Sequence, residues 1–383
     1  MELAPTTRAL FGKAPAELRA LVESMGEPRF RAVQLAGGLY TQRANSLEQI
    51  TTLPAAFRAR LAEEGWVVGL PVLAQTARSI DDTERYLVRM ADGETVETVW
   101  MPNGDGAEDD AAEPAAAEPA SSSYKRATIC VSSQVGCAVN CQFCLTAKLG
   151  IRRNLTAGEI AGQVAAVLNR HGVELGSGRG RPNPDRINLV FMGMGEPFLN
   201  YDEMMAAVRL LALEMKIPET RMTVSTSGIL PGLERYATEP VRPKLALSLN
   251  ASNDRVRESI MPITRKWNIA TLLDSVRAIP LGNREYVTFE YVLLGGVNDQ
   301  PEHAAELIAL VKGMRVKVNL IVWNSGPNMP FAAPTKERAD DFHRTLVNAG
   351  IPAFTRRPRG ADIYAACGQL KRTVEPELVT LGV

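Results

Sequence analysis

The sequence predicts an α/β fold in which strands and helices alternate along the C-terminal part of the chain, behind a small helical module. Two observations support this. After about residue 124, apolar runs of strand length alternate with amphipathic helical patterns, whereas residues 8 to 64 show only helical periodicity. Repeated βα units form a parallel sheet covered by helices, as a closed or a partial barrel. In such folds the polar residues at the C-terminal ends of the strands build the functional site.

The N-terminal region divides into helices, a hairpin and a polar insertion. PAELRALVESMG and FRAVQLAGGLYTQ predict short amphipathic helices, and RYLVRMADGETVETVWMP predicts a hairpin that turns at Asp92-Gly93, with Glu97 on its second strand. Residues 103–123 are rich in Ala, Pro, Ser and acidic residues, which predicts a flexible insertion. We therefore expect a helical accessory module that helps to bind RNA, plus the hairpin, over 1–95, a strand with Glu97 and the flexible insertion over 96–123, and the barrel with a C-terminal segment that carries Cys367 over 124–383.

The barrel region contains six predicted strands. They are RATICVSSQ, INLVFMG, RMTVSTSG, KLALSLN, YVTFEYVLL and KVNLIVW. Helical patterns separate them, among them LTAGEIAGQVAAVLNRHG, YDEMMAAVRLLALEM, ATLLDSVRAI and PEHAAELIALVKG. In the first of these helices, Thr156 and Glu159 have the spacing of a capping box, which predicts where the helix begins.

Composition indicates a cytoplasmic enzyme. The chain has 383 residues, 45% of them hydrophobic, and no apolar run approaches the length of a membrane span. The formal net charge is zero, but the segment from Asp105 to Ser123 holds six acidic residues and no Lys or Arg. The remainder is therefore mildly basic, with 43 basic against 37 acidic residues, and this permits binding to RNA.

Four of the five cysteines lie within fifteen residues. Cys137, Cys141 and Cys144 follow a Cys-x3-Cys-x2-Cys pattern that resembles the signature of the radical S-adenosylmethionine (SAM) superfamily. Three thiolates can hold three irons of a cubane cluster and leave the fourth iron open. A zinc site that lacks a fourth ligand, or a disulfide, is the alternative. The histidines, His171, His303 and His343, are isolated, and we expect no catalytic role for them.

Polar residues follow several predicted strands. Gly195 and Glu196 lie in GMGEP, which resembles the Gly-Gly-Glu element that contacts the SAM amino group. Hydroxyls and amides that suit the ribose and carboxylate of SAM follow at Ser225, Ser227, Ser248, Leu249, Asn250 and Asn324. Helix caps and turns are the alternative explanation. Arg265, Lys266, Arg356, Arg357 and Arg359 could bind phosphates, with Trp267 stacking on a base, although a solvated charged face explains them equally well.

Taken together, the motifs resemble the RlmN family of radical SAM RNA methyltransferases. The segments RATICVSSQVGCAVNCQFC, GMGEPFLNYDE, STSG, LALSLNA, MPI, WN and RGADIYAACGQL occur in that family's order, from about Arg29 to Leu370. The resemblance implies a partial (β/α)6 barrel and methylation of adenosine carbon 2 in the peptidyl-transferase centre of 23S rRNA and next to the anticodon in tRNA. It places a [4Fe-4S] cluster on Cys137, Cys141 and Cys144, and SAM on Gly195, Glu196, Ser227, Ser248 to Asn250, and Asn324, with Ser225 as the alternative serine.

The resemblance also implies roles for three further residues. Cys367 accepts a methyl group from one SAM, and a radical from a second SAM activates that methyl group for addition to adenine. Glu97 is the proton acceptor, and Cys130 forms a disulfide with Cys367 that releases the product. On sequence alone, buried inert thiols are the alternative for Cys130 and Cys367, and a surface glutamate on a hairpin is the alternative for Glu97. A flavodoxin-like external electron donor, no membrane association and a monomeric state complete the expectation.

Two other functions have to be distinguished from this one. The related Cfr methyltransferases modify carbon 8 of the same ribosomal adenosine and share the cluster and the cysteine pair, whereas the helical N-terminus and VETVWMP favour RlmN. A non-catalytic RNA-binding protein with a redox-sensing cluster would not need Cys130, Cys367 and the SAM contacts together. The insertion over 103–123 departs from the family pattern without interrupting a motif.

Overall fold

One ten-stranded sheet forms the body of the protein. The computed structural model describes residues 8–102, 126–175, 185–324, 326 and 329–371. In the described part, seven strands run parallel: β6 (Arg126–Cys130), β9 (Arg186–Phe191), β10 (Met222–Thr226), β11 (Lys244–Ser248), β12 (Val287–Leu293), β13 (Val316–Val322) and β14 (Ala353–Arg356). They follow one another in chain order across the sheet, so each crossover joins neighbours. This arrangement confirms the predicted partial barrel.

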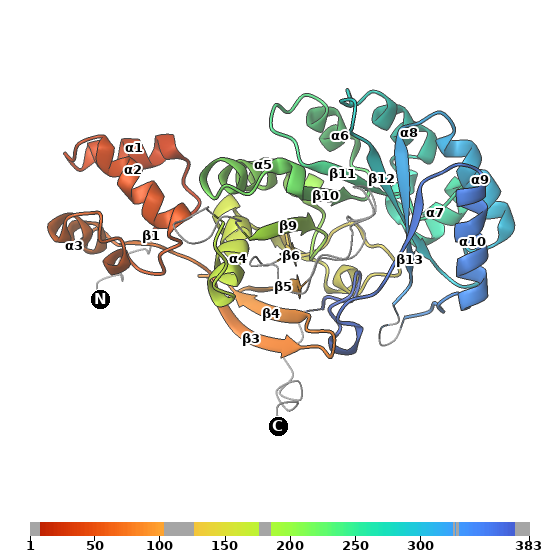
Figure 1. Ribbon diagram of the computed structural model, residues 1–383, viewed down its shortest axis with the longest axis horizontal. Helices are drawn as coiled ribbons and strands as arrows, with labels where there is room; N and C mark the ends of the chain where they lie inside the picture. Colours follow the sequence, from red (N-terminus) through yellow and green to blue (C-terminus); the bar gives the residue numbers. More distant parts are fainter. Residues whose placement is uncertain (1–7, 103–125, 176–184, 325, 327–328, 372–383) are drawn as a thin grey trace.

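Helices connect the parallel strands and cover the outside of the sheet (Figure 1). They are α4 (Ala157–Arg170), α5 (Tyr201–Arg209), α6 (Leu230–Tyr236), α7 (Asp254–Ile260), α8 (Ile269–Arg277), α9 (Pro301–Val311) and α10 (Lys336–Asn348). The capping box predicted for α4 is confirmed: the Glu159 N–H donates to Thr156 Oγ1 at 3.2 Å, and the Thr156 N–H donates to Glu159 Oε2 at 2.9 Å. This cap fixes where the chain turns back onto the sheet after the cysteine loop.

The sheet continues beyond the barrel through three antiparallel strands, β3 (Val72–Arg78), β4 (Glu84–Arg89) and β5 (Thr95–Pro102). The predicted turn at Asp92-Gly93 joins β4 to β5, and Gly93 adopts a φ of 86° that favours glycine. β5 pairs with β6 so that Val99 lies opposite Cys130. The hairpin that the sequence grouped with the helical module is therefore hydrogen-bonded to the barrel, and it brings Glu97 to the same sheet as Cys130.

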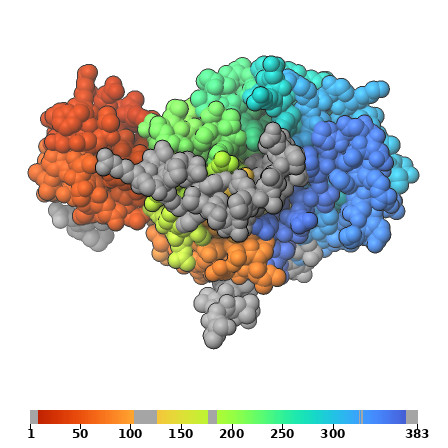
Figure 2. All heavy atoms as spheres, viewed as in Figure 1, coloured from red at the N-terminus to blue at the C-terminus, as the bar shows by residue number. Residues whose placement is uncertain are grey.

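The N-terminal helices form a lobe at one end of the molecule (Figures 1 and 2). α1 (Pro15–Ser24), α2 (Phe30–Ala36) and α3 (Ala55–Glu63) make up this lobe, and the short strands β1 (Arg8–Ala9) and β2 (Trp66–Val67) pair at its base. Arg43 joins the lobe to the end of α4 through hydrogen bonds to Asn169 Oδ1 at 2.9 Å and to the Val173 carbonyl at 2.6 Å.

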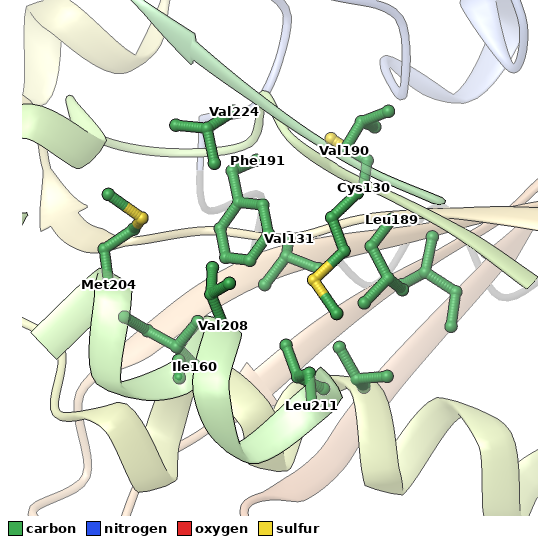
Figure 3. Packing of buried hydrophobic residues seen from close by; sticks show 14 of the residues in the cluster. Cys130, Val131, Ile160, Leu189, Val190, Phe191, Met204, Val208, Leu211 and Val224 are labelled. Carbon is green, nitrogen blue, oxygen red and sulfur yellow. The ribbon is translucent and has the colours of Figure 1, made fainter. Parts of the chain in front are cut away.

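The hydrophobic core lies between the sheet and the helices that cover it. Figure 3 shows Phe191 of β9 pointing toward Val208 of α5, whereas the neighbouring Val190 lies on the other side of the strand. Cys130 lies at the edge of this core and is 8% exposed. Among the described residues, no helix is long and apolar enough to cross a membrane.

Candidate active site

The three motif cysteines lie in a loop enclosed by a small hairpin. β7 (Gln134–Gly136) pairs with β8 (Ile151–Asn154), and the cysteines occupy the connection between them. Gly136 has a φ of 85°, and a Cβ at this position would lie 1.8 Å from the Gly150 carbonyl oxygen, so only glycine fits. The Gln142 N–H donates to the Ile260 carbonyl at 2.8 Å and ties the loop to the end of α7.

The three thiols line one open cavity, here called the first cavity. Burial raises the pKa of Cys137 to about 12 and raises the pKa values of Cys141 and Cys144 as well. Thiolates are therefore disfavoured until a metal offsets their charge. Within the described residues, no three His, Cys, Asp or Glu side chains converge on a point where one ion could bind. In a four-iron cluster each thiolate binds a different iron, so this donor set fits a cluster.

Glu196 stands where β9 ends, beside the cysteines. Its Oε2 accepts from the Ser227 N–H at 2.7 Å and its Oε1 accepts from the Phe198 N–H at 3.0 Å, which links the ends of β9 and β10. Gly195 has a φ of 102°, and a Cβ there would lie 2.6 Å from the Gln134 side chain. The glycine thus lets the turn approach the cysteine hairpin closely. Burial raises the pKa of Glu196, although the Ser227 N–H opposes this.

The predicted SAM contacts are brought together, with one exception. The first cavity is lined by Gly195, Glu196, Ser225, Ser227, Ser248, Asn250 and Asn324. Of the two candidate serines, Ser225 is adjacent to another predicted contact, since its Oγ lies 3.3 Å from Ser248 Oγ. Leu249 does not line this cavity, because its side chain is fully buried in the core. Asn250 has a φ of 57°, and its Oδ1 accepts from the Val292 N–H at 2.9 Å, so its side chain also braces β12.

A second cavity adjoins the first at Cys367. It is lined by Met101, Cys130, Met192, Asn324, Arg356, Arg357, Arg359, Cys367 and Leu370, among others. Cys367 lines both cavities, whereas Cys130 lines the second and the three motif cysteines line the first. Cys130 and Cys367 are not joined by a disulfide in this structure. The two cysteines that are 237 residues apart in sequence therefore meet at one cavity, with Cys367 on the wall shared with the first.

Two family models match the chain. One, described as the radical SAM superfamily, matches residues 131–308, and the other, described as the ribosomal RNA large subunit methyltransferase N-terminal domain, matches residues 9–67. A probable dual-specificity RNA methyltransferase RlmN of Koribacter versatilis is 54% identical over 360 residues, which span 94% of this chain and 100% of that relative. The chain belongs to the RlmN family.

Other RlmN relatives and a solved structure agree with this assignment. The dual-specificity RNA methyltransferase RlmN of Anaeromyxobacter sp. (strain Fw109-5) is 46% identical over 92% of this chain and 88% of its own length. A crystal structure of a radical SAM methyltransferase from Sphaerobacter thermophilus superposes with a TM-score of 0.82 at 40% identity and covers 95% of this chain and 99% of that one. Membership of the radical SAM superfamily implies a [4Fe-4S] cluster and SAM.

Glu97, the acid that the RlmN resemblance singles out, is buried. It is 1% exposed, in contrast to the alternative of a surface glutamate. Its Oε1 forms an ion pair with Arg85 at 3.0 Å, and its Oε2 accepts from the Lys371 N–H at 2.9 Å. Glu97 does not line either of the two cavities, but it anchors the backbone four residues after Cys367.

Two further residues at the site, Arg257 and Glu290, were not predicted from the sequence. Arg257 is fully buried on α7, and its guanidinium donates to the carbonyls of Ser227 at 2.6 Å and Ser248 at 3.2 Å. It therefore holds the ends of β10 and β11 side by side. Glu290 on β12 lines the first cavity, and its buried Oε2 has no hydrogen-bond partner among the described residues. An acceptor left unpaired beside the predicted SAM contacts fits a ligand that carries hydrogen-bond donors.

The remaining candidates have structural surroundings. Arg265 pairs with Glu258 at 2.7 Å, Lys266 lies over the Trp267 ring, and Trp267 packs against the core and lines neither of the two cavities. His171 stacks on Trp100, with ring centroids 3.9 Å apart. His303 accepts from the Gln300 N–H, and a ring nitrogen of His343 lies 2.9 Å from the Ala353 carbonyl oxygen. The acidic insertion lies outside the described residues.

Proposed function

We propose that this protein methylates carbon 2 of adenosine in 23S rRNA and in tRNA, with Cys367 as the methyl carrier. The observation that supports this most strongly is the position of Cys367 on the wall shared by the two cavities. A carrier must meet the methyl donor on one side and the acceptor on the other. Ordinary methyl transfer would need neither a carrier nor a partner cysteine.

The second cavity is the proposed site for the target adenosine. Its walls combine the thiols of Cys130 and Cys367 with the basic side chains of Arg356, Arg357 and Arg359. Guanidinium groups bind phosphate oxygens, and the apolar wall offered by Met101 and Met192 suits a nucleobase turned out of its stack. The mild excess of basic residues outside the insertion is consistent with an RNA substrate.

The roles proposed for the two cysteines come from the family resemblance, and this arrangement is consistent with them. Cys137, Cys141 and Cys144 hold the cluster, which together with SAM supplies radical chemistry when bound. Cys367 accepts the methyl group through its sulfur and presents the resulting carbon to adenine, so that protein and RNA become joined through that sulfur. Cys130 then attacks the sulfur of Cys367, which releases the RNA and leaves a disulfide that an external reductant restores to two thiols.

From the family resemblance, Glu97 is proposed as the final acceptor of the proton from carbon 2; because Glu97 lines neither cavity, the proton has to reach it through an intermediate group. Arg85 lies 3.0 Å from Glu97 Oε1 and is its ion-pair partner in this buried position. The same carboxylate binds the Lys371 N–H, so proton transfer and the placement of the Cys367 segment share one side chain.

Further parts of the proposal come from the family. Two SAM molecules are consumed per turnover, a flavodoxin-like donor supplies electrons, and the protein acts as a cytoplasmic monomer without a membrane partner. Methylation of carbon 8, as in the Cfr relatives, and a non-catalytic iron-sulfur RNA-binding protein are the alternatives.

The test is anaerobic reconstitution with iron and sulfide, then incubation with SAM, reductant and unmodified 23S RNA or tRNA. Nucleoside mass spectrometry should detect 2-methyladenosine with the unaltered protein and none with Cys367→Ala. An 8-methyl product would assign the protein to the Cfr activity. SAM cleavage without methylation would overturn the RNA assignment, and no cleavage of SAM to 5′-deoxyadenosine would favour the non-catalytic alternative.

A further inference from the structure

The segment that carries Cys367 is held against a turn from a distant part of the chain. This turn, residues 79–83, joins β3 to β4, and in Figure 1 the blue C-terminal segment meets the orange hairpin there. Ser79 Oγ donates to Asp362 Oδ1 at 2.5 Å, and the Ile80 N–H donates to Asp362 Oδ2 at 3.2 Å. In the opposite direction, the Gly360 N–H donates to Asp81 Oδ2 at 3.2 Å. Two carboxylates therefore link the turn to residues just before Cys367.

The hairpin does not need these contacts to close. The Ser79 N–H donates to the Thr83 carbonyl at 2.8 Å, and the Asp82 N–H donates to the Ser79 carbonyl at 3.1 Å. The Thr83 N–H adds a bond to Asp81 Oδ1 at 3.0 Å. Ile80 at the tip is 93% exposed, so the side chain at the tip itself does not pack against the protein. The hydrogen bonds to Gly360 and Asp362 therefore serve to attach the segment that carries Cys367 to the turn.

The backbone of this segment is shaped to meet the turn. Gly360 has a φ of 61°, and a Cβ there would lie 2.7 Å from Ala365 Cβ and 2.9 Å from Thr83 Cγ2. After Cys367, the Gly368 carbonyl accepts from the Leu145 N–H at 2.8 Å, close to the cysteine loop. Cys367 thus stands between an anchor to the hairpin on one side and an anchor to the cysteine loop on the other.

We propose that the turn over residues 79–83 is a positioning device for Cys367, and that Asp362 and Asp81 are the residues through which it acts. The two carboxylates hold the segment so that the Cys367 thiol stays on the wall shared by both cavities and within reach of Cys130. This inference rests on the proposed carrier role of Cys367. Fixing a thiol near its partner raises the partner's effective concentration, because the entropy of bringing them together has already been lost.

The test measures how readily the two thiols pair. Full-length, cluster-loaded protein is equilibrated anaerobically in glutathione buffers, and the Cys130–Cys367 disulfide is quantified by mass spectrometry of peptides. In this exchange glutathione disulfide gains two electrons and two protons and becomes two thiols, while Cys130 and Cys367 lose the same number and form an S–S bond. The equilibrium constant, in units of glutathione concentration, is the effective concentration of one thiol at the other.

Asp362→Ala should lower this constant about tenfold, since it removes two hydrogen bonds to a charged acceptor. Ser79→Ala should lower it in the same direction. The double variant should lower it no further than Asp362→Ala alone, because both changes break the same contact. Asp340→Ala is the matched control, because Asp340 is an exposed aspartate on α10 that forms an ion pair with Lys336 at 3.3 Å.

A second measurement separates positioning from general stability. Alkylation of Cys367 by iodoacetamide should become faster in Asp362→Ala, while the melting temperature should match that of Asp340→Ala. An effective concentration equal to that of the unaltered protein in both Asp362→Ala and Ser79→Ala would overturn the positioning role. If the unaltered protein formed no Cys130–Cys367 disulfide in any buffer, the proposed function itself would fail instead.

Discussion

Arg257 allows a quantitative test of how the site is held together. Its guanidinium lies in the interior and donates to three main-chain carbonyls, those of Ser227 at 2.6 Å, Ser248 at 3.2 Å and Leu249 at 3.0 Å. It also donates to Thr264 Oγ1 at 2.9 Å. Burial lowers the pKa of Arg257 to about 10, so the side chain is still a cation at neutral pH. These bonds join the strand ends that carry the predicted SAM contacts.

Arg257→Met removes every donor while keeping most of the apolar volume. Each buried acceptor left unpaired costs roughly 1–3 kcal/mol. Removing the guanidinium also removes the desolvation cost of burying a cation, which offsets part of that sum. From the three carbonyls we expect the free energy of unfolding to fall by about 3 kcal/mol. SAM binding should weaken as well, since Ser227 and Ser248 would no longer be held in place.

Urea denaturation followed by circular dichroism measures the first effect, and equilibrium dialysis with labelled SAM measures the second. Arg255→Met is the control, because Arg255 is exposed on the same helix. A loss of less than about 1 kcal/mol relative to this control would refute the claim that Arg257 bridges the strand ends, because a single unpaired buried carbonyl already costs that much.

Three further predictions follow from individual contacts. Gly136→Ala should abolish iron binding on reconstitution. Gly93 has nearly the same φ (86° against 85°), but a Cβ added there would meet no atom within 4 Å, so Gly93→Ala should lose only about 1–2 kcal/mol of stability and keep its iron. Equal iron content in the two variants would contradict this. Arg85→Met should destabilise by about 3–5 kcal/mol because it removes the ion-pair partner of the buried Glu97, and adding Glu97→Gln should recover most of that loss in urea denaturation. Burial by itself would raise the pKa of Asp81, but the hydrogen bonds from Thr83 and Gly360 outweigh burial and lower it. The stability that the Asp81 carboxylate contributes should therefore be present above the ordinary aspartate pKa and disappear as pH falls through the lowered pKa. Comparing the free energy of unfolding of Asp81→Asn with that of the unaltered protein over acidic pH tests this, and a stability difference that grows on acidification would contradict it.

Much of the barrel could be predicted because its signals are local. Strand-length apolar runs, the Thr156 and Glu159 cap and the polar residues after each strand are all contained in short windows of sequence. Parallel strands in chain order then bring those polar residues to one edge, which is where the first cavity lies. The short strand β14 lacked such a signal, since its four residues alternate too briefly to indicate a strand.

The contacts that could not be predicted join residues far apart in sequence. The pairing of β5 with β6 spans the acidic insertion, so nothing local indicates that Val99 faces Cys130. Arg257 lies in NDRVRES, a segment whose charges suggest a solvated helix face, and only the packing of α7 shows that it is buried. The hydrogen bond between Ser79 and Asp362 joins positions 283 residues apart, and no helical or strand periodicity in the sequence indicates such a contact.

The most direct test of the central claim follows the sulfur of Cys367. Protein carrying Cys130→Ala is reconstituted, incubated with SAM, reductant and RNA, and digested with protease and nuclease before mass spectrometry. If Cys367 is the carrier and Cys130 releases the product, the peptide containing Cys367 should carry an adenosine joined through a one-carbon bridge, and little free 2-methyladenosine should appear. Repeated turnover to free 2-methyladenosine by this variant, with an unmodified Cys367 peptide, would contradict the account.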